Sequence, residues 1–385
     1  MTLLRSDAAT GDAIRLLSAI GDALGGHEAG FAMRVAQTAA RFALHRGANA
    51  ETVAASYYAA ALHEIGAVRV VVPENISERE AAIAAWDAPV AGAAISATIG
   101  RLPHATGDYI RWHREAFDGT GFPDKLRWNG IPHAAMAINI ARAFIATIEA
   151  QGEDPSPPEA LFAIVGECGR TFAINVVREF REFFAATATG FDEPFEPEWS
   201  LDGIDGDAIV VAMCNEIDAR EERTLGRGER LDALVRAIAG ASPDLRIDTD
   251  RAAFAARLTS LGRLRGDRRA DDFDPLARLG REARAAASAS AAQTLSSAPA
   301  YAPYAAIVAQ TEEWFDGKGL PTRRKGEAID PIARVLAVAV AADALQGSMY
   351  ANAANGYPEA SARIAVAAGT QFDPAVVAAY LKACA

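Results

Sequence analysis

The stretch "EAFDGTGFP" at residues 115–123 recurs as "EWFDGKGLP" at residues 313–321. Each copy is a glutamate followed by a short loop that contains an aspartate, two glycines and a closing proline. Glycine permits backbone conformations with positive φ, and proline fixes the exit of the chain from the loop. Because one chain carries this loop twice, the shape of the loop is expected to serve the fold rather than to hold a metal.

The loop residues are therefore predicted to be structural in both copies. Asp118 can accept backbone N–H bonds inside the turn, and Glu115 is expected to anchor the loop to a neighbouring helix. The predicted structural set is Glu115, Asp118, Gly119 and Gly121 in the first copy and Glu313, Asp316, Gly317 and Gly319 in the second.

The repeat extends outward from the loop over most of the chain. Residues 22–43 align with 218–239, and "ALHEIGAV" (61–68) aligns with "RLTSLGRL" (257–264), both at an offset of 196. The offset is 198 at the loop and 200 where Phe172 meets Phe372. Several blocks in one order, with an offset that drifts by only four residues, predict two tandem copies.

The apolar pattern within each copy is helical. Residues 31–44 place Phe31, Val35, Thr38 and Phe42 on one stripe, the spacing of an amphipathic helix. The same period is found in residues 53–65, 134–149 and 158–166, whereas only "RVVVP" (69–73) resembles a strand. The sequence therefore predicts an all-α fold, with five to seven helices in each copy.

The predicted domains are residues 1–186 and residues 207–385. Residues 187–206, which are rich in acidic residues, proline and glycine, are expected to form a linker packed over the surface. The two domains are expected to pack as a pseudo-twofold pair, since duplicated domains often reuse a homodimer interface.

Composition restricts the partners and the compartment. The net charge of −12 over 385 residues argues against nucleic acid, whose phosphates attract clustered lysine and arginine. Three scattered cysteines without a CxxC pair indicate reduced thiols. No segment has the roughly 20 consecutive apolar residues of a membrane helix, and no signal peptide is evident. A cytoplasmic protein without a membrane partner is expected.

The order of the motifs resembles the HD-GYP family, a branch of the HD-domain metal-dependent phosphohydrolases. The matching motifs are "LHEIG" (62–66), "HREAFDGTGFP" (113–123) and "IP" (131–132), with counterparts in the second copy, and the resemblance covers roughly 13–185 and 207–385. It implies two tandem HD-domain-like bundles. Many members hydrolyse cyclic di-GMP with two or three iron or manganese ions, which polarise a phosphoryl oxygen and supply hydroxide.

The resemblance implies metal ligands at positions that the first copy has largely changed. Phe31, Ala88, Arg114 and Arg142 stand where the family carries ligands, and Ala67 replaces a lysine that would face substrate phosphate. The remaining candidate metal ligands are His63, Glu64 and His113. These three cannot form a cage for two ions. The expectation is no cofactor, or at most a single divalent ion, Fe or Mn, in the first domain.

A single-metal site would need further ligands, for which His27, Glu115 and Asp87 are the candidates. His27 lies one helical turn before Phe31, in a loop where we expect it to be exposed to solvent. Arg142 would repel a metal, because its guanidinium is a permanent cation.

Two roles are open for the arginines. In the first, Arg142 forms an ion pair with Glu64, which would otherwise be a costly buried charge. In the second, Arg114 and Arg142 form a cationic pocket for a phosphate group together with His113, because arginine binds phosphate in a bidentate manner.

The second copy contains no histidine at all. The positions that match the family's ligands are occupied by Arg227, Thr259, Ser260, Thr311, Glu312 and Val340. The second domain is therefore expected to be structural or regulatory.

Three functions remain open from the sequence. The favoured one is a degenerate, non-catalytic signalling scaffold or a sensor of a cyclic dinucleotide or other phosphate ligand, with output through a protein partner. The alternative is a metal-dependent phosphodiesterase or phosphohydrolase that acts through His63, Glu64 and His113. The third is a structural oligomerisation module, for which an exposed apolar patch would be the mark.

Overall fold

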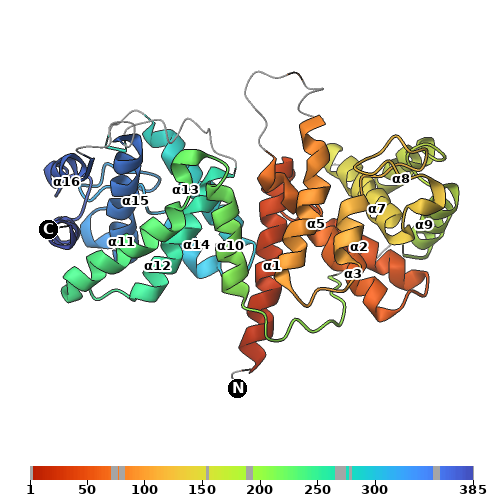
Figure 1. Ribbon diagram of the computed structural model, residues 1–385, viewed down its shortest axis with the longest axis horizontal. Helices are drawn as coiled ribbons and strands as arrows, with labels where there is room; N and C mark the ends of the chain where they lie inside the picture. Colours follow the sequence, from red (N-terminus) through yellow and green to blue (C-terminus); the bar gives the residue numbers. More distant parts are fainter. Residues whose placement is uncertain are drawn as a thin grey trace. The chain divides into compact units, whose positions relative to one another are not determined.

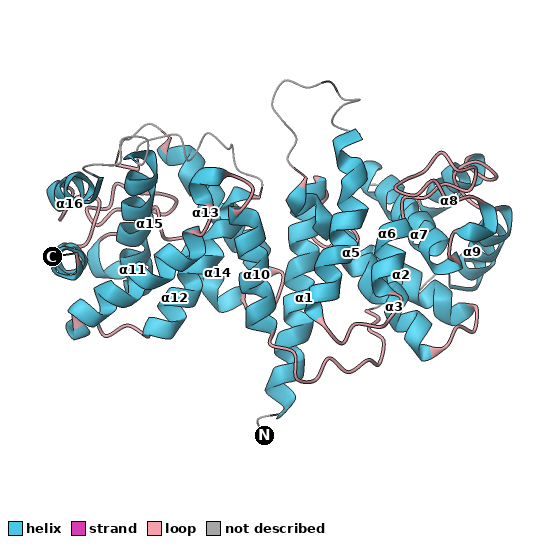
Figure 2. Cartoon of the chain, in the orientation of Figure 1, coloured by secondary structure: helices cyan, strands magenta, loops and turns pink. Residues whose placement is uncertain are grey.

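The structure is a computed structural model that describes residues 3–70, 77, 83–152, 156–187, 194–264, 275–276, 280–349 and 356–384. Within these ranges the chain is helical and forms no β-sheet (Figure 2). The only strand-like features there are two isolated bridges, Cys168–Phe172 and Ala368–Phe372. The predicted all-α fold is confirmed. Most of the predicted strand at 69–73 lies outside the described residues, and Arg69 ends a 3₁₀ helix.

The chain divides into two compact units, residues 1–209 and 210–385 (Figure 1). The helices of the first unit are α1 (Leu3–Gly25), α2 (Phe31–His45), α3 (Ala50–Ala61), α5 (Ala88–Ile99), α6 (Thr106–Trp112), α7 (His133–Ala150), α8 (Pro157–Gly166) and α9 (Ile174–Thr187). Short 3₁₀ helices are η1 (Ile65–Arg69), η2 (Ala85–Asp87) and η3 (Trp128–Gly130).

The second unit repeats this order. Its α-helices are α10 (Gly206–Asp218), α11 (Arg227–Ala241), α12 (Thr249–Leu258), α13 (Arg281–Ser296), α14 (Ala302–Val308), α15 (Pro331–Met349), α16 (Gly356–Val366) and α17 (Pro374–Ala383). Its 3₁₀ helices are η4 (Glu222–Thr224), η5 (Pro243–Leu245), η6 (Thr259–Arg263) and η8 (Gly326–Ala328). Each unit thus has eight α-helices among the described residues, so the predicted number of five to seven was too low.

Helix α2 is the amphipathic helix that the sequence predicts. Phe31, Val35, Thr38 and Phe42 are all buried, and α2 packs against α3 and α7. The chain enters α2 through Gly30, whose φ is +91°, and the side chain of Asp22 accepts hydrogen bonds from the amides of Gly30 and Ala32 at 2.8 Å each. A buried carboxylate therefore satisfies two amides at the start of the helix.

Helix α3 begins with an N-cap and ends before the predicted boundary. The Asn49 side chain accepts a hydrogen bond from the Thr52 amide at 2.8 Å, as expected for an N-cap residue. The helix predicted over 53–65 ends at Ala61, and a turn leads into η1. This turn carries His63 and Glu64. Gly66, in η1, lies directly against α5, because a Cβ atom there would be 1.9 Å from the Ala88 carbonyl oxygen.

The repeated loop has the same geometry in both units. Gly119 and Gly317 have φ of +83° and +85°. Gly121 does not have positive φ, contrary to expectation, and is required for another reason: a Cβ atom would lie 2.1 Å from the Ala116 amide nitrogen. The equivalent distance at Gly319, to the Trp314 amide nitrogen, is 2.0 Å. Both loops close with a cis proline.

Carboxylates hold each loop in place. Asp118 accepts the Thr120 amide at 2.9 Å and Asp316 accepts the Lys318 amide at 2.9 Å, as predicted for residues that bond within the turn. The Glu115 carboxylate accepts hydrogen bonds from backbone amides just after the loop, from Asp124 at 2.7 Å and from Leu126 at 3.0 Å. Glu313 does the same with Thr322 and Arg324 at 2.7 and 3.0 Å. These glutamate side chains thus anchor the loop to its own backbone and not to a neighbouring helix.

Residues 194–205 run over the first unit. The Trp199 indole donates to the Arg101 carbonyl at 2.9 Å, and Glu196 forms an ion pair with Arg15 at 2.8 Å. Leu201 is buried. In the described part of the chain, no helix combines the length and the apolar character needed to cross a membrane.

Candidate functional site

The structure brings His63, Glu64 and His113 together from two separate turns. His63 and Glu64 follow α3, and His113 caps the end of α6. The imidazole rings of the two histidines meet edge to face, with centroids 5.2 Å apart. His63 Nε2 lies 3.5 Å from Glu64 Oε1. His113 is about fifty residues from His63 and Glu64 in the sequence, yet the three candidate ligands are neighbours in space.

Both histidines are oriented in the same way. The Nδ1 atom of each lies 2.6 Å from the carbonyl oxygen three residues earlier, Ala60 for His63 and Ile110 for His113. Such a bond requires a proton on Nδ1 and leaves the lone pair of a neutral imidazole on Nε2. Burial lowers the pKa of His63 to about 4 and the pKa of His113 well below its ordinary value, so both are neutral at pH 7.

The guanidinium of Arg114 occupies the centre of this cluster. Its Nη2 atom lies 2.5 Å from Glu64 Oε1, and its Nε atom donates to His113 Nε2 at 3.1 Å. Burial, the largest single influence, would raise the pKa of Glu64, but the surrounding positive charges, chiefly that of Arg114 and also that of Arg142, together outweigh it and hold the pKa below its ordinary value. One arginine therefore contacts both an acidic and an imidazole candidate ligand.

Arg142, on α7, is the second cation of the site. The ion pair expected between Arg142 and Glu64 is wrong, because the partner of Glu64 is Arg114. Among the described residues Arg142 has no ion pair, and its Nε atom is enclosed without a hydrogen-bond partner. Burial and the nearby charge of Arg114 lower the pKa of Arg142 to about 10. This guanidinium is charged at pH 7 and lies near another cation, and among the described residues Glu64 attracts it without forming an ion pair.

The three additional candidate ligands do not join the cluster. His27 is not the exposed residue that was expected: its ring stacks on Phe31 at 3.7 Å, and its Nδ1 lies 3.2 Å from Glu149. Glu115 is engaged by the amides of the loop. Asp87 is exposed and precedes α5 without capping it. Phe31, which replaces a ligand, lies between His27 and His63.

The donor set fits a divalent ion poorly. Of the three candidate ligands, only His63 has a buried donor atom, Nε2, without a hydrogen-bond partner among the described residues, whereas Glu64 and His113 Nε2 both bind the guanidinium of Arg114. In the part of the chain that the structure describes, no group of three or more His, Cys, Asp or Glu side chains is arranged to hold a metal. Two arginines, Arg114 and Arg142, supply positive charge to this cluster.

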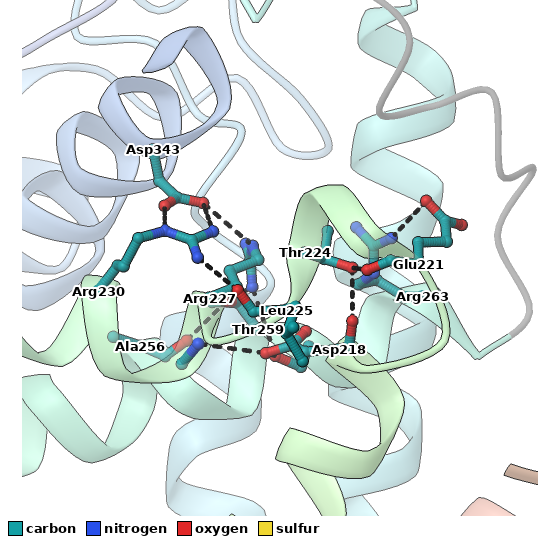
Figure 3. A network of polar contacts seen from close by, with 12 residues as sticks. Asp218, Glu221, Thr224, Leu225, Arg227, Arg230, Ala256, Thr259, Arg263 and Asp343 are labelled. Carbon is teal, nitrogen blue, oxygen red and sulfur yellow. Dashed lines mark hydrogen bonds and ion pairs between the residues drawn. The ribbon is translucent and has the colours of Figure 1, made fainter. Parts of the chain in front are cut away.

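The corresponding region of the second unit also contains arginines, Arg227 and Arg230, which stand at other positions than Arg114 and Arg142 (Figure 3). Arg227 stands where the first unit has Phe31, and its Nη1 donates to Thr259 Oγ1 at 2.9 Å. Ser260 donates to Asp218 at 2.9 Å. Arg230 forms an ion pair with Asp343 at 2.6 Å. Each of these two arginines therefore has protein partners.

The position of Arg114 in the second unit carries the opposite charge. Glu312 lies there, and it forms an ion pair with Arg284 at 3.1 Å. Thr311, which stands where the first unit has His113, bonds Ser288 at 2.9 Å. Val340, the counterpart of Arg142, is an apolar residue packed on the core of this unit. Among the described residues, a pair of imidazoles beside an arginine that forms no ion pair is found in the first unit.

Sequence reasoning missed two features of the site. No role was predicted for Asp22, the first residue of the repeated block 22–43, although its counterpart Asp218 is also buried and also bonds the start of the next helix, at Gly228. The recurrence of an aspartate eight to ten residues before a helix could have revealed this role. The sequence could not show that Glu64 pairs with Arg114 rather than with Arg142, because the two arginines have the same chemistry.

Comparison with known proteins now identifies the fold. A solved structure, described as that of cyclic GMP-AMP-specific phosphodiesterases in V. cholerae, is similar with a TM-score of 0.69, at 18% identity over 97% of this chain and 97% of that chain. No curated protein sequence matches the chain. The profile of the HD domain matches residues 15–172 and again residues 212–376. The predicted resemblance is confirmed, and the chain belongs to the HD-domain family, with one HD domain in each half.

Proposed function

We propose that the first HD domain is a metal-independent, non-catalytic binding domain for a phosphate-containing ligand of the cyclic-dinucleotide class. In this proposal the chain acts in signalling, as a sensor or scaffold whose output passes through a protein partner. The observation that carries it is the position of Arg114 between Glu64 and His113, beside Arg142, which forms no ion pair with the described residues and whose Nε atom has no hydrogen-bond partner among them.

Electrostatics supports an anionic ligand. Two guanidinium groups share the site with a single carboxylate, Glu64, and two neutral histidines, so the cluster has an excess of positive charge. A buried charge without a partner is costly, and a phosphate oxygen would provide the missing counter-charge of Arg142. Arg114, whose side chain is 28% exposed, gives the site contact with solvent.

The similar solved structure supports the cyclic-dinucleotide class. Its description names cyclic GMP-AMP as the substrate, and its fold matches this chain over nearly its whole length. The resemblance to the HD-GYP family implies metal ions that contact the phosphate. Here arginines would take over phosphate contact, which provides binding without the activated hydroxide that hydrolysis needs.

The test is calorimetric titration of cyclic GMP-AMP and cyclic di-GMP into the full chain in the presence of EDTA, together with a hydrolysis assay. We expect binding without turnover. Arg142→Met should weaken binding by about tenfold or more, the equivalent of about 1.4 kcal/mol. Arg170→Met is the matched control, since it removes the same charge from an exposed arginine that pairs with Glu167. Loss of binding in EDTA would contradict the proposal.

A residual phosphodiesterase is the second candidate function. The buried Nε2 of His63, without a hydrogen-bond partner, and the identical orientation of His113 favour it. In that case His63, Glu64 and His113 would hold one divalent ion, which supplies Lewis acidity when bound. Elemental mass spectrometry after growth with supplemented iron and manganese separates the two functions. Near-stoichiometric metal that is lost in the His63→Ala and His113→Ala variants would favour the enzyme.

A further inference from the structure

A pair of stacked aromatic rings is carried by segments whose backbones contact the turns of Arg114 and Glu64. Trp86, in η2, stacks on Phe122 with ring centroids 5.6 Å apart and an interplanar angle of 15°. Trp86 is 40% exposed, which is unusual for so large an apolar side chain. An indole that is backed by one ring and still accessible to solvent is a surface on which a planar group can stack.

Both members of the pair are connected to the arginine site through the backbone. The Phe122 amide donates to the carbonyl of Arg114 at 3.3 Å, so the backbone of Phe122 lies directly against the backbone of Arg114. Trp86 lies two residues before Ala88, whose carbonyl is in contact with Gly66. Gly66 in turn follows Glu64 by two residues. Short backbone connections therefore link the aromatic pair to the turns that carry Glu64 and Arg114.

The stretches of the second unit that match these segments carry other residues. Its loop has Leu320 in place of Phe122, and Glu312 in place of Arg114. Residues 280–300, which include helix α13, contain no aromatic residue that could replace Trp86. Since both loops have the same backbone geometry, the fold does not require an aromatic ring at this position. The aromatic pair accompanies the arginines in the first unit alone.

We propose that Trp86, backed by Phe122, is a stacking platform for the base of a nucleotide whose phosphate is bound by Arg114 and Arg142. The inference rests on the proposed function and specifies its ligand: a nucleotide, and not a phosphate ester without a base. Stacking of a base on an aromatic side chain contributes about 1–3 kcal/mol. The platform provides affinity through the face of the base, and the arginines provide it through charge.

The experiment measures two probes on three tryptophan variants by calorimetry in EDTA. The probes are cyclic GMP-AMP, which has bases, and inorganic pyrophosphate, which has none. Trp86→Ala should weaken cyclic GMP-AMP binding by about 5-fold to 100-fold, from the stacking contribution, and leave pyrophosphate binding unchanged. Trp86→Phe should restore most of the affinity, because a phenyl ring also stacks. Trp128→Ala is the control, since Trp128 is 60% exposed in the same unit.

The outcomes distinguish this inference from the proposed function. Wild-type cyclic GMP-AMP affinity in Trp86→Ala, together with weakened binding in Arg142→Met, would overturn the platform and leave the phosphate site standing. An equal loss of pyrophosphate binding in Trp86→Ala would also overturn it, since Trp86 would then merely support the fold. If the wild-type chain binds neither probe, the proposed function fails and the platform fails with it.

Discussion

Arg114 and Arg142 lie in the same site, but their charges are satisfied differently. Arg114 bonds Glu64 and His113, whereas Arg142 has no ion pair in the described part of the chain. A buried charge without an ion-pair partner is typical of a ligand-binding site. The two arginines therefore predict opposite effects on stability.

Arg114→Met should lower the free energy of unfolding by about 2–4 kcal/mol, because Glu64 would remain buried without its cation. Arg142→Met should raise it, by up to about 2 kcal/mol, because a buried cation is replaced by an apolar chain. Urea unfolding followed by circular dichroism at pH 7 measures both. Arg170→Met should stay within about 0.5 kcal/mol of wild type. A large loss of stability in Arg142→Met would show that this arginine supports the fold.

Asp22 predicts a dependence of stability on pH. Burial raises its pKa to about 6, above the ordinary value of 3.8, despite the amides of Gly30 and Ala32 that it accepts. The folded state therefore binds more protons than the unfolded state between about pH 4 and pH 6, so this group makes the free energy of unfolding fall as pH rises through that window. The effect is present in full below pH 4 and lost above pH 6.

The Asp22→Asn variant should lack this contribution. Between pH 4 and pH 7, the wild type should lose on the order of 2–3 kcal/mol of stability relative to the variant. Urea titrations at several pH values measure the difference. Asp108→Asn, which changes an exposed residue on α6, should follow the wild type at every pH. Parallel pH curves for wild type and Asp22→Asn would contradict the raised pKa.

At the scale of elements, the repeated loop depends on contacts that only glycine permits. At Gly121 the loop backbone passes so close to Glu115 and Ala116 that a Cβ atom would lie 2.5 Å from the Glu115 Cα atom. At Gly319 the loop passes in the same way against Glu313 and Trp314. Both loops also bond the turn before the last helix, through Phe117 to Thr171 and Phe315 to Gln371 at 3.1 Å. The loop thus joins distant parts of each unit.

Gly121→Ala and Gly319→Ala should each destabilise the affected unit by about 3 kcal/mol or more, since the backbone must shift to admit the methyl group. Thermal unfolding followed by circular dichroism measures the change. Gly130→Ala is the matched control in the first unit, because a Cβ atom there meets nothing within 4 Å. Equal melting temperatures for Gly121→Ala and Gly130→Ala would mean that the loop is not under this constraint.

At the scale of the whole molecule, each unit has a core of its own. The second unit buries a continuous cluster that includes Leu231, Leu336 and Tyr380, and the first unit buries residues such as Phe42, Phe144 and Phe180. Domains with separate cores usually fold as separate units. The chain offers a natural cut before α10, at Gly206.

Fragments 1–205 and 206–385 should therefore each fold when expressed alone. We expect helical circular dichroism and a cooperative thermal transition for both, with binding of cyclic GMP-AMP retained only by the first. A fragment that lacks a cooperative transition would show that its unit needs the other. Binding by the second fragment would contradict the assignment of the ligand site to the first unit.

The sequence by itself determined the repeat, the helical class and the loop. These features depend on residues that are near one another along the chain, such as the stripe of α2 and the glycines at 119 and 121, so local rules predict them. The sequence also showed which ligand types of the family are missing. The number of helices was underestimated, because short helices such as α6 have too few residues for a clear period.

Only the tertiary structure decided how the remaining side chains pair. From the sequence, either of two arginines could have been the ion-pair partner of Glu64. The packing of η1, α5 and α6 places Arg114, not Arg142, against it. The same packing brings Trp86 onto Phe122, which no periodicity connects. The physical reason is that an ion pair or a ring stack depends on distances of a few ångströms between residues that are far apart in sequence. Those distances are fixed only when the helices have packed.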